Sequence, residues 1–69
     1  MNRIWHYTKD KEFPTSDCNM LCYVDYKGYI TVHYCADGKY YGIESGDLID
    51  VADIDMWADL NDVLERAGF

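Results

Sequence analysis

Two short glycine-containing turns limit what this chain can fold into. The runs "NMLCYVDY" and "YITVHYCA" are rich in β-branched and aromatic residues, and Lys27-Gly28 separates them. A second pair, Asp37-Gly38, leads into "KYYGIE". Glycine in the second position is typical of a two-residue hairpin turn, because glycine readily adopts positive φ. The pattern therefore predicts an antiparallel meander of three strands.

Two-residue turns would fix the register of this meander and assign each side chain to one face of the sheet. The more apolar face, which we predict to be the core side, would carry Leu21, Tyr23, Ile30, Val32, Tyr34, Tyr41 and Ile43. The more polar face would carry Met20, Cys22, Val24, Tyr26, Tyr29, Thr31, His33, Cys35, Tyr40 and Glu44. The segment "RIWHYT" alternates as a fourth strand would, and "KDKEFPTSD" is expected to be a loop because Pro14 cannot donate a ladder bond.

The period of apolar residues changes in the last twenty or so residues. On a helical wheel, one arc of about 120° holds Met56, Trp57, Leu60, Val63, Leu64 and Ala67. Asp50 or Asp53 is expected to cap the N-terminus of this helix. Gly68 suits the left-handed position after a helix and Phe69 would fold back on Leu64, so we predict a helix that ends at about Ala67.

This apolar stripe needs a surface to pack against, and the apolar face of the meander is the available partner. With 69 residues, the chain is expected to form a single domain (1–69) with a thin core. The predicted fold class is α+β, a three- to four-stranded antiparallel sheet with one C-terminal amphipathic helix packed on one face.

Charge is distributed unevenly along the chain. Residues 1–40 carry equal numbers of acidic and basic residues, whereas residues 41–69 carry eight acidic residues against Arg66 and account for the whole net charge of -7. The "MNRIWHYTKDKEF" segment contains no long apolar run, so neither a signal peptide nor a membrane span is expected. We therefore expect a cytoplasmic location and no membrane partner.

The three cysteines cannot all pair within one chain, and reduced thiols are the simpler interpretation. The predicted register places Cys22 opposite His33, where an imidazole activates a thiol in some enzymes. No pocket, oxyanion donors or orienting carboxylate other than Glu44 accompanies this pair, so no enzymatic activity and no catalytic residue are expected. Cys18, Cys22, His33 and Cys35 lack a tight Cys-x-x-Cys spacing, so neither a metal nor a cofactor is expected.

Tyrosines on the more polar face suggest another kind of surface. Tyr26, Tyr29 and Tyr40 are the residue type that stacks on bases, but the negative charge of the chain opposes direct nucleic-acid binding. Tyrosine is also favoured at protein interfaces. The functional alternative is a contact through this face, with a partner protein or with a second copy of the chain. We expect the chain to be a monomer or a weak homodimer.

The acidic segment leads to a different hypothesis. Asp55, Asp59, Asp62 and Glu65 would project from one side of the predicted helix over about 15 Å, a charge density close to that of one DNA strand. The candidate partner-binding residues on this interpretation are Glu44, Asp47, Asp50, Asp53, Asp55, Asp59, Asp62 and Glu65. Such carboxylates would occupy a basic nucleic-acid-binding surface of another protein.

Taken as a whole, this small acidic chain with an aromatic sheet resembles phage-encoded inhibitors that mimic DNA, including anti-CRISPR and anti-restriction proteins. The segment "YKGYITVHYCADGKYY" is also similar to a short phage domain of unknown function, although that family's closing Trp-Met-Pro-Leu-Pro run is replaced here by "DMWADL". The resemblance implies a non-enzymatic, phage-encoded inhibitor that blocks a bacterial defence complex, with a CRISPR effector subunit as its partner. The alternative is an accessory protein that binds through its tyrosine-rich sheet face.

Overall fold

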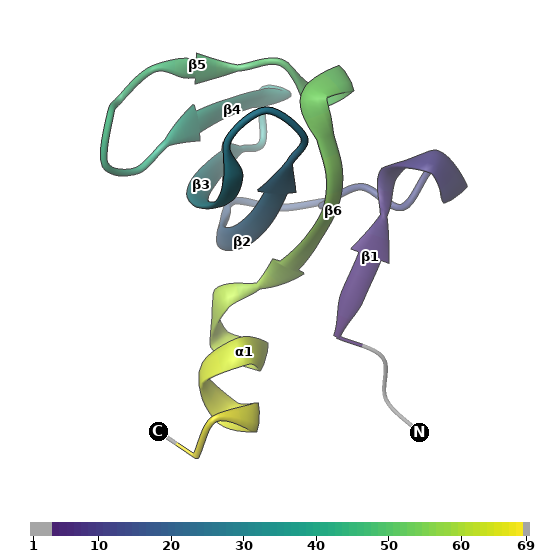
Figure 1. Ribbon diagram of the computed structural model, residues 1–69, viewed down its shortest axis with the longest axis vertical. Coiled ribbons are helices and arrows are strands. Elements are labelled where there is room, and N and C mark those ends of the chain that lie inside the picture. Colours follow the sequence, from purple (N-terminus) through teal and green to yellow (C-terminus); the bar gives the residue numbers. More distant parts are fainter. Residues whose placement is uncertain (1–3, 69) are drawn as a thin grey trace.

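The computed structural model describes residues 4–68 and is mostly β-structure (Figure 1). Its strands are β1 (Trp5–Tyr7), β2 (Cys18–Val24), β3 (Gly28–Cys35), β4 (Lys39–Gly42), β5 (Leu48–Ile49) and β6 (Ile54–Asp59). Two 3-10 helices, η1 (Thr8–Asp10) and η2 (Val51–Asp53), and one α-helix, α1 (Leu60–Arg66), accompany them. The six strands form one antiparallel sheet in the order β1-β6-β2-β3-β4-β5.

The predicted fold class is therefore wrong. The sheet has six strands instead of three or four, because residues 54–59 form β6 and not the first turns of a helix. Met56 and Trp57, which were expected on the helical stripe, belong to this strand. The remaining helix has only seven residues and buries none of them, so it does not form a layer across the sheet.

The meander itself is confirmed, but its register is wrong. The backbone N–H of Lys27 donates to the carbonyl of Val24 at 3.0 Å, so the first turn begins earlier than a two-residue Lys27-Gly28 turn would. Gly28 does have positive φ, at 80°, yet it follows the turn and pairs with Val24. Longer hairpin loops built around a tight turn with a following left-handed residue are a common alternative.

The second turn differs from its prediction in the same way. Gly38 has a φ of 95° and its N–H donates to the carbonyl of Cys35 at 2.9 Å, which makes Cys35 pair with Lys39. A two-residue turn would instead have paired Cys35 with Tyr40. Shifting a register by an odd number of residues moves a strand's side chains to the opposite face.

The predicted core face is therefore correct for β3 but wrong for β2 and β4. The buried hydrophobic cluster contains Met20, Cys22, Val24, Val32, Tyr40, Ile49, Ile54 and Trp57. Of the residues expected to form the core of the sheet and its helix, Val32 and Trp57 belong to this cluster, and Ile30 and Tyr34 are partly buried and pack against it. Leu21, Tyr23 and Tyr41 are half-buried and Ile43 is exposed.

The sheet curves around this cluster. Ile49 in β5 and Ile54 in β6 belong to the same cluster, although three strands separate β5 from β6 in the sheet. Figure 1 shows β4 and β5 curling over β2 and β3, with η2 returning the chain toward β6. The concave side of the sheet is therefore the core side, and the opposite side is called the outer face below.

The end of the helix matches its prediction. Ala67 is the C-terminal cap of α1, Gly68 has a φ of 84°, and the N–H of Gly68 donates to the carbonyl of Glu65 at 3.1 Å. The expected contact of Phe69 with Leu64 lies outside the described residues. The expected N-terminal caps were misplaced: Asp50 caps η2 and Asp59 caps α1.

Candidate interaction surface

The outer face carries two rows of large side chains that cross four strands. Register places Trp5 beside Ala58, Ala58 beside Leu21, and Leu21 beside Thr31. In the second row, the paired positions are Tyr7, Met56, Tyr23 and Tyr29. Paired residues in a sheet project to the same side, so both rows share the outer face.

We call the six large side chains of these rows the outer aromatic patch: Trp5, Tyr7, Leu21, Tyr23, Tyr29 and Met56. The ring centroids of Tyr23 and Tyr29 are 5.1 Å apart in an edge-to-face arrangement. The Trp5 and Tyr29 rings are 6.2 Å apart and tilted. Aromatic pairs at such distances attract each other, so the patch is held in a defined arrangement before any partner binds.

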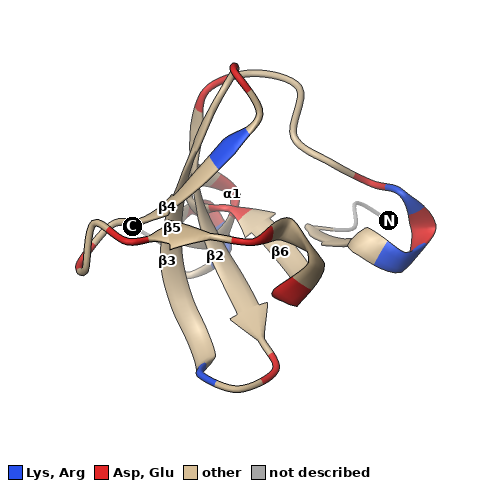
Figure 2. Ribbon diagram, turned by 90° about the horizontal axis from the view of Figure 1, so that it is seen from above, with Lys and Arg blue, Asp and Glu red and all other residues tan. Residues whose placement is uncertain are grey.

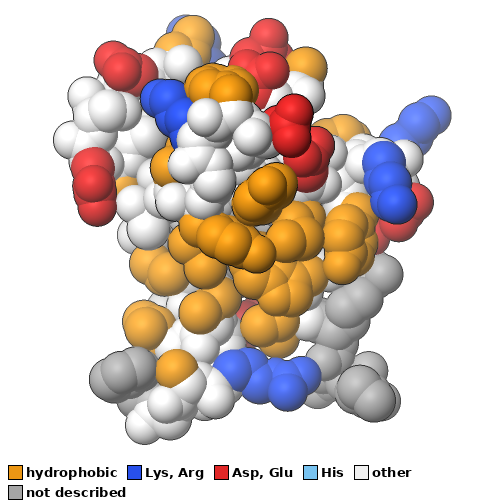
Figure 3. Space-filling model, in the orientation of Figure 1, with side chains coloured by type: hydrophobic (Ala, Val, Ile, Leu, Met, Phe, Trp, Pro, Cys, Tyr) orange, Lys and Arg blue, Asp and Glu red, His pale blue; other side chains and the backbone are white. Residues whose placement is uncertain are grey.

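Solvent reaches much of this patch. Tyr29 is 60% exposed, and the other five residues are half-buried. Ala58, which lies between Trp5 and Leu21 in the first row, is fully buried and adds no exposed area to the patch. Figure 3 shows hydrophobic side chains in a continuous band across the middle of this view of the molecule. A contiguous patch of this kind is typical of surfaces that contact another protein.

The tyrosine surface expected from the sequence is only partly correct. Tyr29 lies in the outer aromatic patch, but Tyr40 is 8% exposed and belongs to the core. Tyr26 lies in the β2–β3 turn and is 61% exposed. Desolvation, and then the carboxylates of Asp53 and Asp50, raise the pKa of the Tyr26 hydroxyl. These three tyrosines therefore do not share one surface.

Sequence reasoning missed five of the six patch residues as candidates for binding. The signal was the spacing of two in "WHY", which puts Trp5 and Tyr7 on one side of a strand, and the same spacing of Leu21 and Tyr23. The second pair was assigned to the core because the register was shifted. Met56 was assigned to a helix.

The acidic residues do not gather on one helix face. Glu44 and Asp47 lie between β4 and β5, Asp50 and Asp53 lie at η2, and Asp55 lies in β6. Asp59 is the cap of α1, and only Asp62 and Glu65 lie within that helix. Figure 2 shows the acidic residues at separate places around the ribbon. The predicted row from Asp55 to Glu65 along a single helix is therefore wrong.

Two of these carboxylates have local structural roles. Asp50 Oδ1 accepts a hydrogen bond from the N–H of Ala52 at 3.0 Å. Asp59 Oδ1 accepts one from the N–H of Asn61 at 2.9 Å. Both are capping contacts, in which the side-chain oxygen accepts a hydrogen bond from a backbone N–H that has no partner within the helical turn. Glu44, Asp47 and Asp55 are exposed and have no such capping contact.

The Cys22 and His33 pair does not exist. Cys22 pairs with Ile30 and projects into the core, whereas His33 pairs with Asn19 on the outer face. His33 Nδ1 lies 2.7 Å from Asn19 Oδ1. Burial, with a smaller contribution from Cys18, raises the pKa of the Cys22 thiol to about 12, which keeps it protonated at neutral pH. A protonated buried thiol is a poor nucleophile.

The four side chains considered for zinc also fail to converge. Alternation along the strands puts Cys18 and Cys22 on the core side and His33 and Cys35 on the outer face. Within residues 4–68, no group of three or more histidine, cysteine, aspartate or glutamate side chains is arranged to hold a metal ion. All three cysteines are free thiols.

No known protein-family model, curated protein or solved structure matches this chain. Within the described part of the chain, α1 is too short to cross a membrane, and no other helix there is long and apolar enough to do so.

Proposed function

We propose that this chain is a non-enzymatic binding protein that docks on a partner protein through the outer aromatic patch. The observation that carries the proposal is the pair of cross-strand rows, which aligns six large side chains on the exposed side of a rigid sheet. Aromatic residues and methionine are enriched where proteins meet, and burying them supplies most of the binding energy at such contacts. The division of Cys22 and His33 between opposite faces favours binding over catalysis.

Affinity capture from a bacterial lysate tests this proposal with matched variants. The patch variant is Tyr23→Thr with Tyr29→Thr, because threonine suits an exposed strand position. Tyr26→Thr is the control, since Tyr26 is equally exposed but lies outside the patch. We expect the wild type and the control to retain the same partner and the patch variant to lose it, with at least about a tenfold change in affinity once that partner is purified. Equal capture by all three proteins would contradict the proposal.

A second candidate function is a phage-borne inhibitor that mimics DNA and occupies a basic surface of a defence complex. The observation that favours it is the segment from Glu44 to Asp55, which carries five carboxylates without a basic residue and wraps from β4 to β6. Four of these carboxylates belong to exposed residues, and the fifth, that of Asp53, is half-buried. Lysine and arginine side chains that normally hold phosphates would pair with such groups.

This second candidate predicts a different variant and a different dependence on salt. Glu44→Gln, Asp47→Asn and Asp55→Asn together remove charge without disturbing the caps at Asp50 and Asp59. If these carboxylates replace phosphates, partner binding falls steeply with added salt, duplex DNA competes, and the neutral variant binds weakly. Loss of capture with the patch variant alone supports the outer aromatic patch, and loss with the neutral variant alone supports DNA mimicry.

A further inference from the structure

The ladder between β3 and β4 does not extend to the N-terminal end of β3. Its last pair is Val32 with Gly42, and one further bond joins the N–H of Ile43 to the carbonyl of Thr31 at 3.0 Å. The chain then turns away, because Gly42 accepts a bond from Gly46 and donates one to Asp47, both at 2.8 Å. The first residues of β3 therefore have a strand neighbour on the β2 side only.

Backbone groups at this open edge have a defined direction. The bond from Ile43 to Thr31 shows that Thr31 directs its N–H and carbonyl groups toward the β4 side, and alternation directs those of Tyr29 the same way. No backbone bond from another of residues 4–68 reaches Tyr29 on that side or the N–H of Thr31. Two donors and one acceptor thus lie along an edge of about 7 Å.

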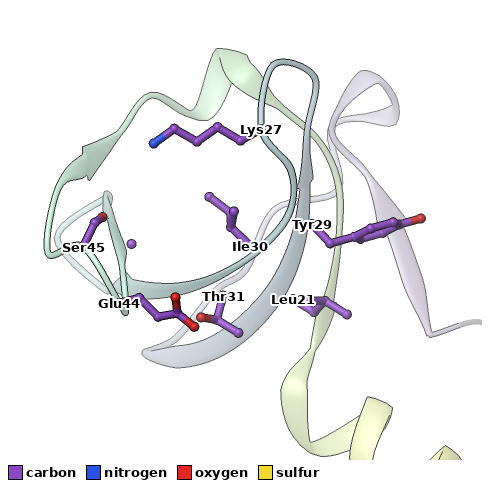
Figure 4. A pocket seen from close by; sticks show the side chains of 8 residues that line it. Leu21, Lys27, Tyr29, Ile30, Thr31, Glu44 and Ser45 are labelled. Carbon is purple, nitrogen blue, oxygen red and sulfur yellow. The ribbon is translucent and has the colours of Figure 1, made fainter.

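A hollow of about 250 Å³ adjoins this edge. In Figure 4, Ile30 projects into the hollow, Lys27 extends across it from the β2–β3 turn, and Glu44 lies beside Thr31 on the opposite border. The Tyr29 ring points away from the hollow toward β1. Lys27 and Glu44 form no ion pair within the described residues, so opposite charges lie at the two ends of an apolar floor.

We propose that this hollow and edge, the β3-edge groove, bind an extended peptide segment of a partner as an additional antiparallel strand. Every neighbouring pair in the sheet is antiparallel, and a strand added here in the same sense runs from the Thr31 end toward Lys27. Its basic residue then meets Glu44, and an acidic residue four positions later meets Lys27. Adding a strand to an open edge is an established mode of peptide recognition, in which backbone bonds supply affinity and side-chain pockets supply specificity.

This site goes beyond the outer aromatic patch, because the groups that bind are backbone atoms at a strand edge. The occupant is an extended peptide and not a small molecule, since the unpaired groups repeat at the spacing of a strand. The middle residue of the segment lies opposite Tyr29 and projects to the outer face, where it should be apolar to pack beside Leu21 and Tyr29. The residues on either side of it project toward Ile30.

Nuclear magnetic resonance titration of the ¹⁵N-labelled protein tests the proposal. The probe is the capped peptide acetyl-Lys-Thr-Val-Thr-Glu-amide, added to about 1 mM, where weak complexes are populated. We expect saturable shifts at the amides of Tyr29 and Thr31. The same peptide with an N-methylated valine should bind at least about tenfold more weakly, because it loses a donor and cannot approach the edge. This comparison uses the wild-type protein and does not depend on the folding of a variant.

Charge polarity is tested with the reversed peptide acetyl-Glu-Thr-Val-Thr-Lys-amide, which should bind about threefold or more weakly. Lys27→Gln should remove this preference, whereas Lys39→Gln, at an exposed position outside the groove, should leave it intact. Thr31→Pro should abolish binding, because proline is tolerated where a strand N–H is unpaired but blocks the edge.

Three outcomes would overturn the proposal. They are the absence of shifts at Tyr29 and Thr31, equal binding of the N-methylated peptide, and shifts of these amides that depend on protein concentration without peptide. The last result would assign the edge to a second copy of the chain.

Discussion

The Trp57 indole donates a hydrogen bond from Nε1 to the backbone carbonyl of Glu12, 2.9 Å away. This bond joins β6 to the loop after η1 across 45 residues of sequence. The same indole stacks on the His6 ring with the centroids 4.4 Å apart. One side chain therefore holds β1, the following loop and β6 together at the margin of the core.

Two substitutions of Trp57 should separate the contribution of its hydrogen bond to stability from the contribution of its burial. Trp57→Phe leaves the Glu12 carbonyl without its donor and should lower the free energy of unfolding by about 1 to 3 kcal/mol. Trp57→Ala also leaves a cavity and should cost about 3 to 5 kcal/mol, a large part of the stability of so small a domain. Urea unfolding measures both. Trp5→Phe is the control, because no other described residue hydrogen-bonds to the Trp5 indole, and a loss equal to that of Trp57→Phe would contradict this account.

The effects of substitutions at Gly42 and Ser45 on stability should be coupled. A Cβ atom on Gly42 would lie 2.6 Å from Ser45 Oγ, which itself accepts a bond from the N–H of Asp47 at 3.2 Å. Gly42→Ala must therefore displace the Ser45 hydroxyl, and we expect a loss of about 1 to 3 kcal/mol. In a Ser45→Ala background the same substitution should cost less by about 1 kcal/mol. A double-mutant cycle measures this coupling, and strictly additive effects would show that the close approach has no energetic consequence.

Local signals in the sequence located the turns but not the register. Gly28 and Gly38 were correctly identified as positive-φ positions, and the three strands around them were found. The loop length was not encoded in either dipeptide, because the same glycine serves a two-residue turn or the position after a longer one. Odd shifts then exchanged the core and outer faces of β2 and β4, whereas the faces of β3 were predicted correctly. Cys22 was therefore paired with His33, and Leu21 was assigned to the core.

The second failure was at β6. Its "IDMWAD" stretch fits a helical stripe and also a strand, and no local rule separates the two for a short apolar run. The decision comes from pairing with β1 and β2, whose residues are distant in sequence. The two aspartates in this stretch, Asp55 and Asp59, were a signal against the helix, because aspartate is a weak helix former. The charged surface depended on that helix, so its geometry could not be predicted either.

Stability should fall at alkaline pH because of Cys22. Burial raises the pKa of this thiol from 9.0 to about 12 in the folded protein. Below the unfolded-state pKa of 9.0, the thiol is protonated in both the folded and the unfolded protein, and its ionisation does not reduce stability. Between about pH 9 and 12 the thiol ionises in the unfolded protein but not in the folded one, so the free energy of unfolding falls. The slope is at most about 1.4 kcal/mol per pH unit for one thiol.

Urea unfolding across this pH range tests the prediction with Cys22→Ala. The variant should be less stable at neutral pH but should show a smaller alkaline decline. Cys35→Ala, at a half-buried position on the outer face, is the comparison. Parallel pH curves for the wild type and Cys22→Ala would show that another group controls the decline.

Substitutions in the core should lower stability much more than substitutions in the helical stripe predicted from the sequence. Met20 is fully buried between β3 and β6, so Met20→Ala should cost about 2 to 5 kcal/mol. Leu64 is 43% exposed in α1, and Leu64→Ala should cost about 1 kcal/mol or less. Thermal unfolding of both variants measures the difference. Comparable losses would mean that α1 packs more tightly than its exposure indicates.

The position of β6 has a consequence for synthesis of the chain. This strand pairs with β1 on one side and β2 on the other, so the piece that completes the middle of the sheet is made after five other strands. Until the ribosome has released residues 54–59, β2 has a bare edge and the core lacks Ile54 and Trp57. Folding of the sheet should therefore be completed only after residues 54–59 have left the ribosome, and chains stalled before Ile54 should be preferred substrates for chaperones and proteases.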